Sequence, residues 1–383
     1  MQRLIFSADS HIVEPPQMWQ ERVEPAYRDR APRIERDLGG RKGEYYVFDT
    51  LRPIVVTRFF GAGHLRNHDD WAAFEPGGFE RAPKSIFDPG ARLKEQDDDG
   101  VDGELLFPTM GMVMLAAKDE LLKAACFRAV NGYLAEYCRQ DPDRLIGVGV
   151  VSLHDTAAAI KDLQDARAMG LRGVLITGSP GSGGFGAREL DPFWAVAQDL
   201  DMPLTMHDLQ TRGQVAFTMQ EGRERFGFFM LPMEVQLTLA EMIFSGLFDR
   251  FPRLKVVSAE NDIGWLPHFV HRMDHACTKI QSDARVLKRL PGQVVRENVW
   301  ASTQFENANI VNYVARAIGI DRVMWGSDYP HPDSTFPGTR RFILDTYGEL
   351  DTNDQASFLG GNVTRLYQVD LERLQSRRAP RAR

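Results

Sequence analysis

The amino-acid sequence predicts an α/β fold of the (β/α)8-barrel class, and three observations support this prediction. From residue 91 onward, short runs rich in β-branched residues alternate with longer helical patterns, which is typical of βα units around a parallel sheet. Eight such strands can be counted, the number that closes a barrel. The segment SADSHIVEPP at the end of the first strand contains no glycine-rich nucleotide-binding turn, which argues against a doubly wound open sheet.

The predicted strands span residues 4–11, 101–108, 145–153, 173–177, 203–207, 255–260, 299–305 and 323–328. Helical patterns, in which apolar residues recur at spacings of three and four, lie between them at residues 120–139, 156–169, 192–200 and 233–251. A barrel with insertions commonly forms one domain at this length of 383 residues. We therefore predict a single domain over residues 1–383.

Two segments depart from this alternation. Residues 12–90 are rich in proline, arginine and glycine, with one hairpin-like pair around 45–49 and 52–57. Because long insertions in compact folds are usually lids or contact surfaces, we predict that they form a cap inserted after the first strand. The polar and basic residues 372–383 are expected to form a flexible tail.

Composition excludes several classes of partner. The net charge of -7 and the lack of a basic stripe argue against nucleic acid and anionic lipid, so a small molecule is the expected partner. No stretch approaches the run of about 18 apolar residues that a membrane span needs. Cys126, Cys138 and Cys277 are odd in number and lack C-x-x-C spacing, which argues against a disulfide framework and a cysteine zinc site. A cytoplasmic location is expected, since the first residues do not resemble a signal peptide.

Four polar residues close to predicted strand ends suggest a metal site. Asp9 and His11 are two residues apart on the first strand, so their side chains are expected on one face. His207 ends the fifth strand and Asp328 ends the eighth. In a closed barrel the carboxyl ends of these strands meet at one mouth, where barrel enzymes place their chemistry. Two carboxylates and two imidazoles are therefore expected to converge there.

This donor set suits one divalent ion and leaves positions open for water or a substrate oxygen, as a catalytic site requires. Zinc is the first expectation and manganese the alternative. Each residue alone could instead cap a helix or a loop, and it is their coincidence at strand ends that favours a metal. No lysine lies near the end of the fourth strand, where residues 174–177 are VLIT, which argues against a binuclear site built on a carbamylated lysine. His268, His271 and His275 share one face of a predicted helix, and we interpret them as its polar face.

The sequence resembles the amidohydrolase-related family of the amidohydrolase superfamily, whose best-known members are the aminocarboxymuconate-semialdehyde and resorcylate decarboxylase types. The resemblance covers nearly the whole chain and rests on DSHIVEPPQMW, FSGLFDRFPRLKVVSAENDIGWLPHFVHRMD and MWGSDYPHPDSTFP in combination. It implies a distorted TIM barrel, commonly a homodimer, with a single metal held by the first-strand pair, a fifth-strand histidine and an eighth-strand aspartate. At the matching positions these ligands are Asp9, His11, His207 and Asp328.

One departure from the family pattern concerns the sixth strand. Decarboxylases of the family usually carry a histidine there, whereas residues 259–262 of this chain are AEND. Glu260 could act as a base, bind the metal, hold a ligand histidine in its tautomer, or form a structural salt bridge. His331 closely follows Asp328 and could bond a substrate carboxylate, orient Asp328, or cap a helix.

Two reactions are compatible with such a site. In the first, a metal-dependent carboxy-lyase acts on an aromatic or unsaturated carboxylic acid, and Asp328 or Glu260 delivers a proton to the carbon that loses carbon dioxide. In the second, a hydrolase uses a metal-activated water on an ester, amide, lactone or carbon–carbon bond, with Asp328 accepting the proton. We favour the lyase, and metal-free purified protein would instead favour a binding module.

Overall fold

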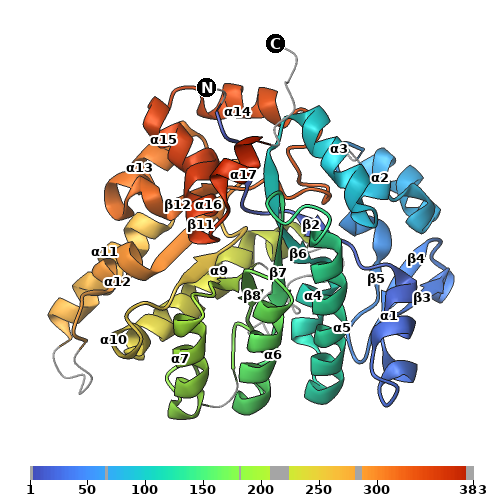
Figure 1. Cartoon of the computed structure of the whole chain (residues 1–383), viewed down its shortest axis with the longest axis horizontal. Helices are drawn as coiled ribbons and strands as arrows, with labels where there is room; N and C mark the ends of the chain where they lie inside the picture. The colour runs from blue at the N-terminus through green and yellow to red at the C-terminus, as the bar shows by residue number, and fades with distance from the viewer. Residues whose placement is uncertain (1–2, 65–67, 181–182, 208–223, 281–286, 377–383) are drawn as a thin grey trace.

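The computed structural model is described over residues 3–64, 68–180, 183–207, 224–280 and 287–376. Its centre is a parallel sheet in the order β1-β6-β7-β8-β9-β10-β11-β12, surrounded by helices (Figure 1). This confirms the predicted α/β barrel. The strands are β1 (Phe6–Ser7), β6 (Gly103–Pro108), β7 (Leu145–Val150), β8 (Gly173–Leu175), β9 (Leu204–Met206), β10 (Val256–Ser258), β11 (Val299–Thr303) and β12 (Val323–Trp325).

The barrel closes between its first and last strands. Ala8 N donates to Trp325 O over 2.9 Å, and His11 N donates to Tyr329 O over 2.7 Å. An isolated parallel bridge joins Ser10 to Tyr329. Among the described residues, β1 and β12 share no continuous ladder. A few backbone hydrogen bonds therefore hold the junction between the first and last strands, which we call the seam of the barrel.

The helices that follow each strand cover the barrel, and side-chain caps begin several of them. Asp119 accepts a hydrogen bond from Leu122 N, and Asp155 accepts one from Ala158 N, which satisfies amide groups that the first turn leaves free. The helices after β6 are α4 (Thr109–Val113), α5 (Glu120–Cys138), α6 (Thr156–Ala168), α7 (Asp191–Asp199), α9 (Glu224–Phe244), α10 (Leu247–Arg250), α11 (Leu266–Lys279), α12 (Pro291–Asn298), α13 (Ala308–Ile318), α14 (Thr339–Tyr347), α15 (Thr352–Ala356), α16 (Asn362–Leu366) and α17 (Leu371–Ser376).

The segment between β1 and β6 forms a small sheet and short helices beside α5 (Figure 1). Its sheet is antiparallel in the order β3-β4-β5, so the predicted hairpin pair is present, and a third strand that was not predicted joins it. Met18, Trp19 and Phe60 from this segment are buried in one apolar cluster with Phe107 of the barrel. The elements are β2 (His11–Ile12), α1 (Pro16–Arg22), β3 (Arg33–Arg36), β4 (Glu44–Val47), β5 (Ile54–Val55), α2 (His68–Phe74) and α3 (Pro89–Asp99).

Helix α9 corrects one prediction. The predicted helix over 233–251 was wrong at both ends, because α9 starts at Glu224 and stops at Phe244, where Gly246 adopts a positive φ of 70° and α10 begins. Its segment Arg225–Phe244 has a mean hydropathy of 1.3, enough in length and composition to cross a membrane, although 44% of it is buried inside the protein. Its inner residues Val235, Leu239 and Met242 pack in the barrel core.

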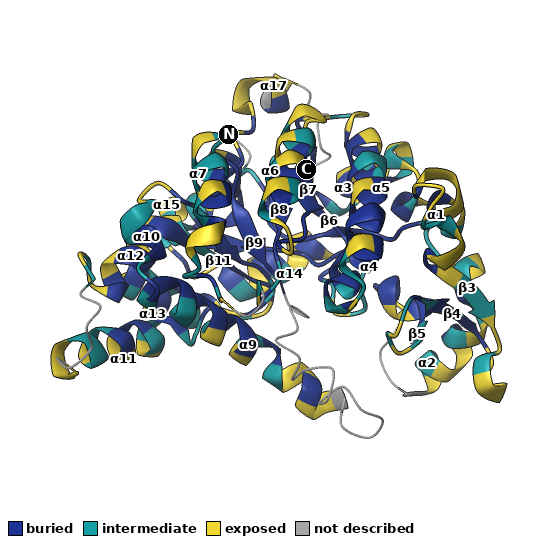
Figure 2. Cartoon of the chain, turned by 90° about the horizontal axis from the view of Figure 1, so that it is seen from below, coloured by how far each residue is buried: buried dark blue, intermediate teal, exposed yellow. Residues whose placement is uncertain are grey.

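The C-terminal tail is also more ordered at its start than predicted. Residues 371–376 form α17, and Leu374 is 1% exposed, so the predicted flexible tail is wrong for residues 372–376. The remaining residues 377–383 lie outside the described part of the chain. The burial of strands beneath exposed helix faces is visible in Figure 2.

Candidate metal centre

The first predicted strand is divided in two, and Asp9 lies in the break. The Asp9 carbonyl accepts hydrogen bonds from the hydroxyls of Ser7 and Ser10, over 2.7 and 2.8 Å. It also accepts from the backbone N–H groups of Ser327 and Asp328, over 3.1 and 2.8 Å. These bonds replace strand pairing at this point, since side-chain hydroxyls compete with ladder hydrogen bonds. The prediction of a continuous strand over 4–11 was therefore wrong, yet Asp9 and His11 still face the same site.

The other two predicted ligands follow their strands directly. His207 comes after β9 and Asp328 comes three residues after β12. Asp328 has a positive φ of 56°, and Glu260 after β10 has one of 54°. Such backbone conformations are uncommon outside glycine and gather at functional sites. All four predicted ligands are at most 1% exposed.

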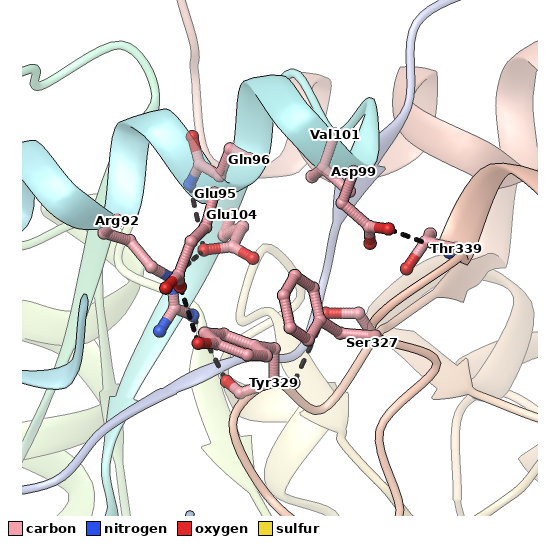
Figure 3. A pocket seen from close by; sticks show the side chains of 10 residues that line it. Arg92, Glu95, Gln96, Asp99, Val101, Glu104, Ser327, Tyr329 and Thr339 are labelled. Carbon is pink, nitrogen blue, oxygen red and sulfur yellow. Dashed lines mark hydrogen bonds and ion pairs between the residues drawn. The ribbon is translucent and has the colours of Figure 1, made fainter. Parts of the chain in front are cut away.

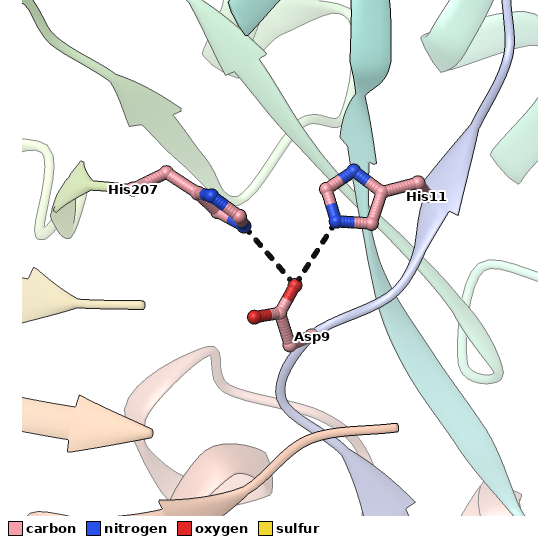
Figure 4. Close-up of side chains that lie close together, drawn as sticks. All are labelled: Asp9, His11 and His207. Atoms are coloured by element: carbon pink, nitrogen blue, oxygen red, sulfur yellow. Dashed lines mark hydrogen bonds and ion pairs between the residues drawn. The ribbon is translucent and has the colours of Figure 1, made fainter. Parts of the chain in front are cut away.

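These side chains form one continuous set of contacts. Asp9 Oδ1 lies 3.3 Å from His11 Nε2 and 3.1 Å from His207 Nε2, and Figure 4 shows both imidazoles directed at this carboxylate. His11 Nε2 also lies 3.1 Å from Asp328 Oδ1. The structure thus brings together the four residues that the sequence singled out, from the first, fifth and eighth barrel segments.

The separations fit a shared ion. Two ligand atoms that are each about 2.1 Å from an ion lie about 3.0 Å apart when their bonds meet at a right angle. One candidate ligand atom from each of Asp9, His11 and His207 lies within 4.8 Å of the others, and the same holds for His11, Asp328 and His331. Asp9 Oδ2 is buried without a hydrogen-bond partner among the described residues. Buried carboxylate oxygens are normally hydrogen-bonded or bound to metal, so the donors present fit a divalent cation.

The two carboxylates differ in their electrostatic surroundings. Burial acts to raise the pKa of Asp9, but His207 and His11 outweigh it and hold this pKa below its usual range. Burial raises the pKa of Asp328 to about 6, with His331 opposing the shift and the nearby Asp9 charge adding to it. A cation between the carboxylates would offset both the burial and the repulsion.

Comparison with known proteins places this chain in a family. A family model described as amidohydrolase matches residues 20–369. The chain belongs to the amidohydrolase family. This confirms the resemblance seen in the sequence.

Two curated relatives of this amidohydrolase are decarboxylases. A 2-amino-3-carboxymuconate-6-semialdehyde decarboxylase from Dictyostelium discoideum is 23% identical over 301 residues, which cover 76% of this chain and 80% of the relative. A gamma-resorcylate decarboxylase from Rhodococcus jostii (strain RHA1) is 27% identical over 278 residues, which cover 68% of this chain and 84% of the relative.

Solved structures share the fold. An amidohydrolase from Mycobacterium avium subsp. paratuberculosis K-10 aligns with a TM-score of 0.77 at 22% identity, covering 97% of this chain and all of that one (100%). A dihydroxybenzoic acid decarboxylase from Polaromonas sp. JS666, with bound manganese and the inhibitor 2-nitroresorcinol, aligns with a TM-score of 0.66 at 18% identity. The alignment covers 96% of this chain and 97% of that one.

The amidohydrolase site contains both further residues that the sequence singled out. His331 Nδ1 lies 2.8 Å from Asp328 Oδ1, and its ring stacks on His11 with centroids 4.0 Å apart. Glu260 Oε2 lies 3.5 Å from His207 Nδ1, on the side of the ring opposite Asp9. His268, His271 and His275 are exposed on α11, as expected of a polar helix face.

Two residues at the site were missed. Phe107 places its ring 4.9 Å from that of His207 and 5.8 Å from that of His11, between centroids. Thr109 Oγ1 lies 3.2 Å from His331 Nε2 and donates to Ile12 O over 2.8 Å. Phe107 lies near the end of β6 and Thr109 begins α4 directly after it. Their position at the end of the second predicted strand was the signal available, but neither side chain suggests metal or acid–base chemistry by type.

Proposed function

We propose that this amidohydrolase is a metal-dependent decarboxylase of an aromatic or unsaturated carboxylic acid. The observation that carries the proposal is the buried convergence of Asp9, His11, His207 and Asp328 at the barrel mouth, in a chain whose curated relatives include two decarboxylases. Those four residues would hold one divalent ion. When bound, the ion supplies a Lewis acid that polarises substrate oxygens.

Either zinc or manganese suits this set of donors. The two imidazoles favour zinc, and the two carboxylates are equally suited to manganese, which is the ion present in the similar decarboxylase from Polaromonas. We retain zinc as the sequence-based expectation. Elemental analysis of the purified protein decides between them.

Asp328 is the proposed proton donor. Decarboxylation breaks the bond between the substrate carbon and its carboxylate, carbon dioxide leaves, and the electron pair left on that carbon takes up one proton. Asp328 Oδ2 has no hydrogen-bond partner among the described residues, and we assign this oxygen to the side of the carboxylate that meets the substrate. His331 Nδ1 contacts the other oxygen, Oδ1, and its side chain is 15% exposed where that of Asp328 is 1%. His331 is thus placed to return a proton to Asp328 from the solvent side.

Glu260 is proposed to orient His207. A carboxylate beside Nδ1 favours the tautomer that carries its proton on Nδ1, which leaves the lone pair of Nε2 directed at the site. The Glu260 Oε2 to His207 Nδ1 separation of 3.5 Å supports this role. Glu260 stands where related decarboxylases usually carry a histidine. This position therefore still has a polar side chain next to the metal ligands.

We further propose that the enzyme is a cytoplasmic homodimer. Cys126 and Cys138 are buried and form no disulfide among the described residues, which suits a reducing compartment. A stripe of large apolar side chains on α9 is exposed, comprising Phe226, Phe229, Met233 and Leu237. Their spacing of three and four places them on one helix face, and such exposed apolar patches mark contact surfaces. Figure 2 shows this end of α9 extending beyond the barrel.

The homodimer is tested by the mass of the protein in solution. Light scattering after gel filtration is expected to give about twice the chain mass of 43.3 kDa, and Leu237→Glu is expected to give one chain mass because it places a charge in the contact. Leu344→Glu is the matched control, since Leu344 is 62% exposed on α14 where Leu237 is 60% exposed on α9. A monomeric wild type, or dimers in both variants, would contradict the proposed contact.

The reaction is tested with a panel of hydroxybenzoates and unsaturated acids beside small esters and lactones. We expect carbon dioxide release from at least one carboxylic acid, lost on chelation and restored by adding zinc or manganese. Acid release from esters or lactones, without carbon dioxide from any acid, would instead establish the hydrolase. Activity that survives complete chelation would contradict both.

A further inference from the structure

A buried arginine lies directly behind the metal centre. Arg92 on α3 is fully buried, and its Nε donates to Glu104 Oε2 of β6 over 2.6 Å. Gln96 Nε2 donates to the same carboxylate oxygen over 2.9 Å, and Ser10 Oγ lies 3.3 Å from Oε1. Glu104 therefore balances the buried charge of Arg92 and holds its guanidinium in one orientation.

The remaining nitrogens of this guanidinium bond to the two ligand-bearing segments. Arg92 Nη1 donates to His11 O over 3.0 Å, and Nη2 donates to Tyr329 O over 3.2 Å. His11 is itself a candidate ligand, and Tyr329 is the residue after Asp328. A single planar group thus connects the first-strand and eighth-strand parts of the site.

These connections fall at the seam of the barrel. Tyr329 O accepts from both His11 N, over 2.7 Å, and Arg92 Nη2, and the neighbouring backbone contact is the isolated bridge from Ser10 to Tyr329. No continuous ladder joins β1 to β12 among the described residues. The relative position of His11 and Asp328 therefore depends on a limited set of bonds, namely these and the bonds that Ser327 N and Asp328 N donate to Asp9 O.

The surroundings of Arg92 hold α3 against the same seam. Its guanidinium carbon lies 4.4 Å from the centroid of the Tyr329 ring, and Tyr329 Oη donates to Glu95 Oε2 over 2.6 Å. Figure 3 shows Arg92, Glu104, Gln96 and Tyr329 around a small cavity, of about 10 Å³. That space is no larger than one water molecule needs, which suits a supporting structure.

We propose that Arg92, paired with Glu104, is a positioning residue that holds the ligand His11 at a fixed separation from the segment that carries the ligand Asp328. The inference rests on the proposed metal centre. Outer partners that orient metal ligands typically change metal affinity or activity by about 10- to 100-fold. Arginine suits this role because its planar fork can reach the carboxylate and both carbonyls together, whereas the single ammonium of lysine cannot.

The test compares metal affinity in variants that avoid an unpaired buried charge. The double variant Arg92→Met/Glu104→Gln removes both charges, since loss of one partner alone would leave the other buried and unpaired. Arg92→Lys keeps the charge but loses the fork. Arg172→Met is the matched control: its Nη1 donates to Gln368 O over 2.7 Å and its Nη2 to Pro142 O over 3.0 Å, just before β8 and so at the opposite end of the barrel strands.

Each metal-stripped protein is titrated with manganese and with zinc by calorimetry, well below its unfolding temperature. We expect the metal dissociation constant to rise about 10- to 100-fold in the double variant, less in Arg92→Lys, and not at all in Arg172→Met even if its unfolding temperature falls. The visible spectrum of the cobalt-loaded double variant should also differ from that of the wild type, because it reports ligand geometry.

The outcomes separate this inference from the function on which it rests. A wild type that binds neither ion would overturn the metal centre itself. If the wild type binds metal, and both Arg92→Lys and the double variant show the same affinity and cobalt spectrum as the wild type, only the role of Arg92 is overturned. Should the double variant not fold, the affinity of Arg92→Lys decides the question alone, and wild-type affinity there counts against the proposal.

Discussion

Changing Asp328 to asparagine is expected to abolish most turnover while much of the metal stays bound. The substitution preserves size and one oxygen donor, but it removes the group that can carry a proton. Loss of a general acid or base typically costs about a hundredfold or more in rate. The account requires that Asp328 use only one oxygen as ligand, and the buried Oδ2 without a hydrogen-bond partner leaves the other for the substrate.

The measurement is kcat together with metal content in the same Asp328→Asn sample. A fall of about a hundredfold or more with near-normal metal content supports the proposed donor. Near-normal turnover with metal bound would move the proton donor to Glu260 or His331 and contradict the central step proposed here.

Changing His207 to alanine is expected to reduce metal content and activity together. The variant loses the imidazole whose Nε2 lies 3.1 Å from Asp9 Oδ1, so the site keeps three of its four proposed ligands. The fold should survive, because the core around the barrel is built from apolar side chains such as Val256 and Trp194. Circular dichroism checks the fold and elemental analysis checks the metal.

His271→Ala is the matched control for this variant. It also removes an imidazole, but from the exposed face of α11, and it should leave metal content and activity unchanged. Full metal occupancy in His207→Ala would refute the assignment of His207 as a ligand.

The ligand positions could be predicted because they depend on short-range patterns. His207 directly follows the β-branched and apolar residues of strand β9 and Asp328 comes three residues after the apolar strand β12, and parallel strands of a barrel bring their carboxyl ends to one mouth. The same reasoning placed Glu260 next to the site. The break in the first strand could not be predicted, since it depends on contacts between Ser7, Ser10 and Ser327, and two of these pairs lie more than 300 residues apart in the sequence.

Arg92 and the residues that it contacts could not be predicted from the sequence for the same reason. Arg92 bonds to partners 12, 81 and 237 residues away, and nothing in its local sequence distinguishes it from the solvent-exposed arginines of the chain. The start of α9 was missed because its first turns carry apolar side chains on an exposed face, including Phe226 and Phe229, where the amphipathic pattern that marks a helix is weak.

The most direct test of the metal centre is a crystal structure of the metal-loaded enzyme with anomalous data collected at the absorption edge of the bound ion. The account predicts one anomalous peak at the barrel mouth, about 2.0–2.2 Å from an oxygen of Asp9, an oxygen of Asp328 and the Nε2 atoms of His11 and His207. A fully loaded protein whose anomalous peak lies away from these four side chains would contradict it.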